Sequence, residues 1–156
     1  MSRKATILVI DDDDSVRKVL SAALEDEGYE VETAETGRKA VEMSRRSFYN
    51  MALIDIRLPD MEGTKLLSEL KDTTPKMRKI IVTGYPSMQN AIEAVKRGAN
   101  DYVVKPFKME SVLETVKAQL KEQQGERQYS EEKVKEFIET RVSEADTEER
   151  KAKGKD

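Results

Sequence analysis

Short, continuous runs of apolar residues recur along the first two thirds of the chain, at residues 7–10, 51–54, 80–82 and 102–104. Continuous runs of this kind are typical of strands that are buried on both faces of a parallel sheet. The segment 30–34 alternates polar and apolar residues instead. That alternation predicts a strand at an edge of the same sheet.

Segments with apolar residues at helical spacing lie between these runs. In the segment 15–27, Val16, Leu20 and Leu24 share one side of a helix, and Gly28 follows as a stop signal. Similar patterns predict helices at 37–46, 64–70, 88–96 and 109–120. Strands that alternate with helices indicate an α/β fold with a parallel sheet.

The composition changes after residue 121. Residues 123–125 (Gln-Gln-Gly) predict a break, and residues 130–142 carry an apolar stripe that predicts a further helix: Val134, Phe137, Ile138 and Val142. From residue 143 onward nearly every residue is charged or small, which predicts disorder. We therefore expect one domain at residues 5–122, followed by a C-terminal extension at 123–156.

Composition excludes several classes of chemistry. The 156-residue chain contains no cysteine and no histidine. Disulfides, thiol catalysis, imidazole catalysis, His-ligated metals and a phosphohistidine within the chain are therefore excluded. The net charge of −3 gives no electrostatic footprint for nucleic acid or a membrane surface. No apolar run approaches the roughly 20 residues of a membrane span, so we expect a cytoplasmic protein.

Polar residues follow the predicted strands at the points where they end. Asp11 and Asp12 follow the first apolar run, Asp55 follows the run at 51–54, and Thr83 and Lys105 follow the next two. In a parallel sheet these ends lie on one edge, where ligands bind. Clustered carboxylates need a cation, and an all-oxygen set suits Mg²⁺, for which Mn²⁺ could substitute. A carboxylate held there can attack phosphorus.

Four motifs carry a family resemblance: VIDDDDSVR, ALIDIRLPDMEG, IIVTGY and DYVVKPF. In this order and spacing the chain resembles response-regulator receiver domains, the family of the bacterial chemotaxis regulator, over residues 5–122. The resemblance implies a flavodoxin-like (βα)5 fold with a doubly wound five-stranded parallel sheet in the order 2-1-3-4-5. It also implies a switch in a two-component system rather than an enzyme with external substrates.

The resemblance assigns roles to individual residues. Asp55 would accept the phosphoryl group, while Asp11, Asp12, Asp55 and the backbone carbonyl of Arg57 would bind Mg²⁺. Thr83 and Lys105 would contact the phosphoryl group. The remaining roles are a cis peptide bond at Lys105-Pro106, an aromatic switch at Tyr102, and tuning of the phosphoryl lifetime by Arg57 and Tyr85.

Two acidic positions have simpler interpretations. Asp13 or Asp14 is expected to cap the first helix rather than extend the acidic cluster. Asp60 is expected to belong to a turn, with Pro59 and Gly63 supplying its geometry.

Partners follow from the same resemblance. Because the chain has no histidine, the phosphoryl group must come from a partner histidine kinase, a phosphotransfer protein or a small donor. The output surface would consist of the helices at 88–97 and 109–119 and the strand at 101–104. We expect control of a downstream protein by direct contact, without nucleic-acid binding or membrane insertion, in a monomer or a phosphorylation-dependent homodimer. A receiver fragment of a longer regulator with an output domain is the alternative.

Three rival functions remain open. An aspartate-nucleophile phosphatase of the haloacid-dehalogenase type would need an Asp at position 57, where this chain has Arg. A flavin-binding module would need a Ser/Thr/Gly-rich loop in place of Asp11–Asp14. A receiver-like scaffold that is never phosphorylated would not need the complete set of site residues.

Overall fold

The computed structural model describes residues 4–153, with side chains described as far as residue 142. The chain divides into two units, one that ends at Lys121 and one that begins at Glu122. The first unit is an α/β domain that carries all of the candidate site residues.

Five parallel strands form one sheet in the order β2-β1-β3-β4-β5. The strands are β1 (Thr6–Ile10), β2 (Glu30–Ala34), β3 (Met51–Ile54), β4 (Arg78–Thr83) and β5 (Asp101–Val104). This order is the flavodoxin-like arrangement that the sequence resemblance implies. The alternating segment forms β2 at an edge, as predicted, and three of the continuous apolar runs form the interior strands β1, β3 and β4. The fourth run, at residues 102–104, forms β5 at the other edge and is only partly buried, so the prediction of burial on both faces was wrong for this strand.

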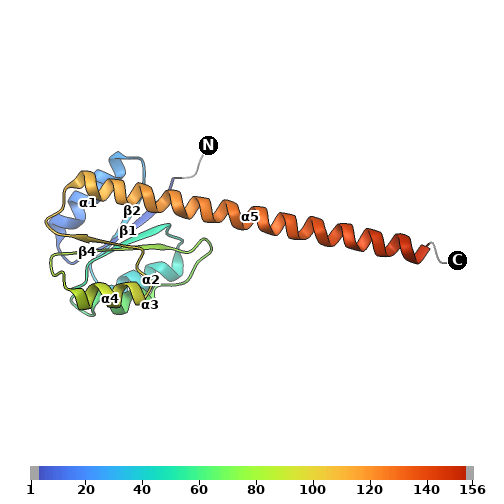
Figure 1. The fold of residues 1–156 in the computed structure, drawn as a ribbon. Coiled ribbons are helices and arrows are strands. Elements are labelled where there is room, and N and C mark those ends of the chain that lie inside the picture. Colours follow the sequence, from blue (N-terminus) through green and yellow to red (C-terminus); the bar gives the residue numbers. More distant parts are fainter. Residues whose placement is uncertain (1–3, 154–156) are drawn as a thin grey trace. The chain divides into compact units, whose positions relative to one another are not determined.

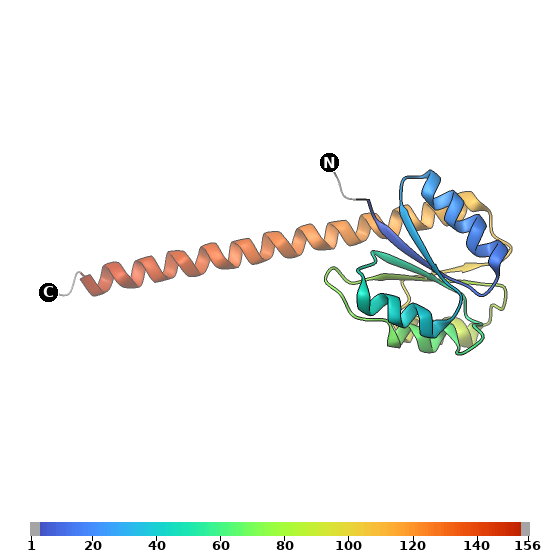
Figure 2. The same ribbon diagram turned by 180° about the vertical axis from the view of Figure 1, so that it is seen from behind.

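Helices cover both faces of the sheet (Figures 1 and 2). They are α1 (Asp14–Asp26), α2 (Gly37–Arg46), α3 (Gly63–Glu69), α4 (Met88–Lys96) and α5 (Met109–Lys153). Leu20 and Leu24 of α1 join Val112 and Val116 of α5 in the core on one face. Helices α2, α3 and α4 contribute to a second core on the opposite face. Two apolar layers therefore hold the strand ends in fixed positions.

Strand β4 begins earlier than its apolar run predicts. Arg78 and Lys79 are both buried at its start, at 7% and 4% exposure. The Lys79 ammonium donates to the Leu67 carbonyl at 2.8 Å, and the Arg78 guanidinium donates to the Gln119 side chain at 3.4 Å. These bonds offset part of the cost of burying two cations. Hydrophobicity alone cannot reveal such positions.

The helix that enters the C-terminal extension is longer than the sequence pattern predicts. Helix α5 continues through residues 123–125, where we expected a break, and through residues 143–153, where we expected disorder. Glu, Lys, Gln and Arg are good helix formers, and one interior glycine, Gly125, costs only about 1 kcal/mol. The predicted apolar stripe is exposed in the structure. Residues 154–156 lie outside the described residues.

Candidate functional site

Strand register brings Asp11 and Asp55 together. Strands β1 and β3 are neighbours, with Ile10 opposite Ile54. The Asp55 N–H donates to the Ile10 carbonyl at 3.0 Å, so the next residue of each strand lies at the same sheet edge. The order of strands reverses between β1 and β3. In doubly wound sheets such a reversal marks the ligand-binding crevice.

An acidic cluster occupies this edge of the sheet. Oxygen atoms of Asp11, Asp12 and Asp55 all lie within 4.8 Å of one another. Asp11 and Asp55 are buried, at 3% and 6% exposure, while Asp12 is exposed. This all-carboxylate set with one open side fits Mg²⁺, which retains several water ligands.

Lys105 lies across the two buried carboxylates. Its Nζ donates to Asp11 Oδ2 at 2.7 Å and to Asp55 Oδ2 at 3.4 Å. The backbone N–H of Lys105 donates to the Thr83 carbonyl at 2.8 Å, which joins this residue to the end of β4. The Lys105-Pro106 peptide bond is cis, and so is Thr74-Pro75, which the sequence did not indicate.

The site carries competing electrostatic effects. Burial, and secondly the charge of Asp11, raise the pKa of Asp55 above its ordinary value, although Lys105 acts against them. Burial acts to lower the pKa of Lys105, but the hydrogen bonds and charges of Asp11 and Asp55 outweigh it, so that pKa is raised. The metal-free site is therefore short of positive charge, and ionised Asp55 destabilises the folded domain.

Replacing Asp55 with Asn is expected to stabilise the metal-free domain at neutral pH, because burial and the charge of Asp11 raise the pKa of the Asp55 carboxyl and make its ionised form unfavourable. A raised folded-state pKa means that stability falls as pH rises from the ordinary value of 3.8 through the folded value. The difference in unfolding free energy between Asp55→Asn and wild type should therefore grow as pH rises above 3.8 and then become constant. Urea unfolding in EDTA, repeated across pH, measures it. Equal stability at all pH values would contradict the electrostatic argument.

Thr83 ends β4, and Tyr102 lies on the neighbouring edge strand β5. Thr83 is fully buried, and its Oγ1 accepts a hydrogen bond from the Tyr85 N–H at 3.0 Å. Tyr102 is half-buried and packs against the core on the α2–α4 face. The Thr83 hydroxyl is thus hydrogen-bonded to the backbone of the β4–α4 loop. A movement of Thr83 would therefore move this loop, and a movement of the loop would move Thr83.

Arg57 and Tyr85 are in contact. The guanidinium carbon of Arg57 lies 3.8 Å from the centre of the Tyr85 ring, a cation–π stack. Arg57 follows β3 and Tyr85 follows β4, so this stack joins the two loops that flank the acidic cluster. Sequence reasoning singled out both positions but gave no sign that they touch.

Two residues at the start of α1 hold the Asp11 segment. Asp13 caps the helix through the N–H groups of Ser15 and Val16, at 2.8 and 3.2 Å, which decides between the two candidate caps. Arg17 donates to the Asp11 carbonyl at 2.7 Å. Sequence reasoning missed Arg17, because its partner is a backbone atom that leaves no trace in the residue pattern.

Two residues of the LPDMEG segment do more than form a turn. The Asp60 carboxylate accepts hydrogen bonds from the N–H groups of Gly37 and Arg38, 2.9 Å each, at the start of α2. At Gly63 a Cβ would lie 2.2 Å from the Asp55 carbonyl oxygen. Only glycine lets α3 begin against the backbone of the candidate acceptor.

The family follows from these features and from a direct match. The response regulator receiver domain family matches residues 7–117. The chain belongs to this family and is a receiver domain of a two-component system. The sequence resemblance had implied this fold, with carboxylates at the ends of β1 and β3 and Lys105 after β5.

Three known proteins illustrate the relationship. The transcriptional regulatory protein ZraR of Escherichia coli K12 is 39% identical over 114 residues, or 73% of this chain and 26% of ZraR. The CheY-like receiver domain protein of Methanospirillum hungatei JF-1 is 42% identical, with a TM-score of 0.77 over 80% of this chain and 99% of that one. A response regulator protein from Burkholderia pseudomallei, solved with a phosphorylated aspartic acid and a calcium ion, is 32% identical. Its TM-score is 0.69, over 80% of this chain and 73% of that one.

The curated relatives also bear on the class of protein. The chain spans about a quarter of the length of ZraR and of AtoC of E. coli K12. Both are described as regulatory proteins. Among the described residues, no helix combines the length and apolar character that a membrane span requires.

Proposed function

We propose that this receiver domain is a switch activated by transfer of a phosphoryl group to Asp55. Mg²⁺ would be held by Asp11, Asp12, Asp55 and the backbone carbonyl of Arg57, with Mn²⁺ able to substitute. The observation that carries the proposal is the acidic cluster itself, with Lys105 bonded to its two buried carboxylates. Mg²⁺-dependent covalent labelling by acetyl phosphate tests it.

The chemistry is a displacement at phosphorus. A carboxylate oxygen of Asp55 attacks the donor's phosphorus and forms an O–P bond, while the bond to the leaving atom of the donor breaks. The donor is a partner histidine kinase, a phosphotransfer protein or a small phosphodonor, since the chain has no histidine of its own. Lys105 supplies a fixed positive charge beside the developing anion. Bound Mg²⁺ would neutralise further negative charge on the transferred group.

Activation would pass from the site through Thr83 and Tyr102. The new phosphoryl oxygens attract the Thr83 hydroxyl and Lys105, which moves the β4–α4 loop, and Tyr102 turns into the space that is vacated. The readout surface is the α4-β5-α5 face. Its exposed apolar residues support a protein-binding role: Met88, Ile92, Val95 and Val104. A partner must prefer one of the two states for phosphorylation to transmit a signal.

The proposed organisation is a receiver domain at residues 5–122 with an extension at 123–156. The names of the curated relatives connect such receivers with transcriptional regulation, so an output domain on the same polypeptide is the second candidate arrangement. We place the protein in the cytoplasm, where histidine kinases present their phosphoryl groups. The active form would be a monomer or a phosphorylation-dependent homodimer.

The Arg57–Tyr85 stack is expected to prolong the phosphorylated state. We propose that the two stacked side chains, which come from adjacent loops, hinder the water that would hydrolyse the phosphoryl group on Asp55. Arg57→Asn and Tyr85→Ala should each speed dephosphorylation about tenfold, equivalent to about 1.4 kcal/mol in the barrier. The measurement is decay of labelled protein after removal of acetyl phosphate.

The double variant tests whether the two residues act together. If the stack is the hindering unit, each single replacement already removes it, and the double variant decays no faster than the faster single variant. Arg45→Asn and Tyr129→Ala serve as matched controls, because both residues lie outside the stack. Unchanged decay in the Arg57 and Tyr85 variants would contradict this role.

A further inference from the structure

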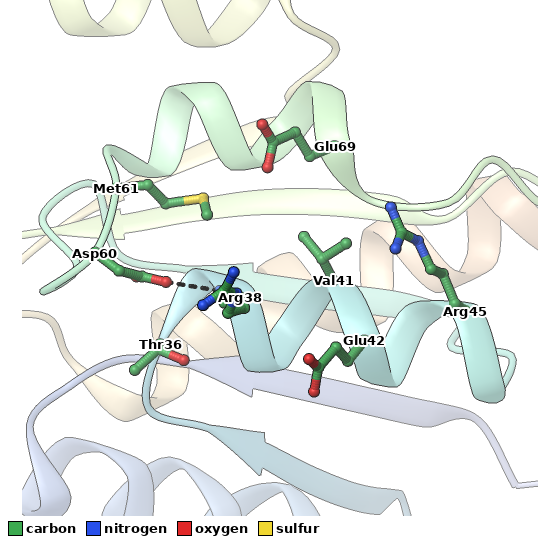
Figure 3. Close-up of a pocket in the computed structure, with 8 residues that line it drawn as sticks. All are labelled: Thr36, Arg38, Val41, Glu42, Arg45, Asp60, Met61 and Glu69. Atoms are coloured by element: carbon green, nitrogen blue, oxygen red, sulfur yellow. Dashed lines mark hydrogen bonds between the residues drawn. The ribbon is translucent and has the colours of Figure 1, made fainter.

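The loop between β3 and α3 is attached to α2 by one carboxylate. Asp60 lies near the tip of this loop, and its two oxygens accept the backbone N–H groups of Gly37 and Arg38, 2.9 Å each. The bond from Arg38 is drawn in Figure 3. These residues are 23 and 22 positions away in sequence. Burial acts to raise the pKa of Asp60, but the bonds from Arg38 and Gly37 outweigh it and lower that pKa. The carboxylate is therefore an ionised cap at neutral pH.

The close approach of loop and helix depends on the residue types that meet there. A Cβ on Gly37 would lie 2.6 Å from the side chain of Met61, the residue after Asp60. Met61, Asp60 and Thr36 converge at the start of α2 (Figure 3). Glycine at position 37 thus lets the loop reach the exposed N–H groups of the helix.

Backbone hydrogen bonds and a bridge connect the loop internally between Asp60 and the candidate acceptor. Arg57 and Glu62 form an isolated antiparallel bridge, and the Leu58 N–H donates to the Met61 carbonyl at 3.3 Å. The Gly63 N–H donates to the Ile56 carbonyl at 2.6 Å and closes the base of the loop. A displacement at Asp60 is therefore carried to Arg57 rather than absorbed between them.

The last connection reaches Asp55 itself. The backbone N–H of Arg57 donates to Asp55 Oδ1 at 3.4 Å, so the position of Arg57 affects the orientation of the acceptor carboxylate. The same residue carries the backbone carbonyl that we propose as a metal ligand. Each step from α2 to the acidic cluster is a hydrogen bond or bridge described above.

From this chain of contacts we infer that Asp60 is a positioning residue for the acceptor site. By holding the β3–α3 loop against α2, it fixes Arg57 beside Asp55 and so prepares the site for Mg²⁺. The inference rests on the proposed function, because it concerns binding of metal at the same cluster. It assigns part of that binding to a residue that touches none of the three clustered carboxylates.

A simpler role for Asp60 would be to stabilise α2 alone. The chain offers a matched control for that role in Thr36, whose Oγ1 accepts the Lys39 N–H at 3.1 Å. Thr36 caps the same helix end but has no hydrogen bond to the β3–α3 loop among those described. Thr36→Ala and Asp60→Ala both remove a cap from α2, and only the second also releases the loop.

The experiment is a Mg²⁺ titration of the full 156-residue chain, followed by NMR, for wild type, Asp60→Ala, Asp60→Asn and Thr36→Ala. Asp60→Ala should bind Mg²⁺ about tenfold more weakly, the lower end of the loss seen when a residue that orients metal ligands is removed. Asp60→Asn should be intermediate, because an amide oxygen accepts in place of one carboxylate oxygen. Thr36→Ala should match wild type. Equal affinities in Asp60→Ala and Thr36→Ala would overturn the inference.

A kinetic readout separates positioning from stability. In Asp60→Ala the Mg²⁺ concentration that gives half-maximal labelling by acetyl phosphate should rise about tenfold, in step with affinity. The maximal rate at saturating Mg²⁺ should stay near that of wild type. A lower maximal rate with an unchanged Mg²⁺ requirement would also overturn the inference. If wild type neither binds Mg²⁺ nor is labelled, the proposed function is overturned, and so is this inference, which requires Mg²⁺ at the acidic cluster.

Discussion

Asp55→Asn is expected to abolish covalent labelling of this protein by acetyl phosphate. The amide of Asn is not a nucleophile toward phosphorus, and no histidine in the chain can accept the group instead. Intact-mass measurement after incubation with acetyl phosphate and Mg²⁺ gives the stoichiometry directly. Wild type should reach near-complete labelling under the conditions in which the variant shows none.

Asp12→Asn is the companion variant for this experiment. It keeps the Asp55 nucleophile but removes one carboxylate of the acidic cluster. Labelling should therefore persist, but a higher Mg²⁺ concentration should be needed to reach half-maximal rate. Addition of EDTA should stop labelling of wild type and of Asp12→Asn. Stoichiometric labelling of Asp55→Asn would place the acceptor elsewhere in the chain and would refute the proposed site.

Gly63→Ala is expected to destabilise the domain by about 3 kcal/mol, at the upper end for an overpacked site. The added Cβ would lie 2.2 Å from the Asp55 carbonyl oxygen and 2.8 Å from the Ile56 Cα. Both are backbone atoms, so α3 or the end of β3 must move. Urea unfolding in EDTA measures the loss without a contribution from metal binding.

Gly125→Ala is the matched control for that substitution. A Cβ at Gly125 would meet nothing within 4 Å, and the residue lies inside helix α5. Alanine should therefore leave stability unchanged or raise it by up to about 1 kcal/mol. If Gly63→Ala proved as stable as wild type, α3 would not be held tightly against the acceptor strand.

The sheet was predictable because burial on two faces leaves a clear pattern. The runs that became β1 and β3 contain only apolar residues. The order of the strands came from the family resemblance, and their register from the structure. The start of β4 was not predictable. Arg78 and Lys79 are buried with hydrogen-bond partners on other elements, and a sequence gives no direct sign of such partners.

Some features of the candidate site were also predictable from the sequence, and others were not. Asp11, Asp55, Thr83 and Lys105 were accessible to prediction because the carboxyl ends of parallel strands meet at one edge. The structure brings these residues together, while their roles stay predictions. The attachment of Asp60 to α2 was missed, because its partners are backbone N–H groups that every non-proline residue carries. The continuous α5 was missed at residues 123–125 and 143–153, where Glu, Lys, Gln and Arg favour a helix without any apolar stripe to reveal it.

The contact between Arg57 and Tyr85 has a consequence for any effort to re-engineer the timing of this switch. Because the two side chains stack on each other, the effect of a new residue at one position depends on the residue present at the other. A library that varies one position at a time holds the other residue fixed, so it samples few of the possible pairs. Sensors with graded response times should instead be sought among paired substitutions, in which the guanidinium and the ring are replaced together.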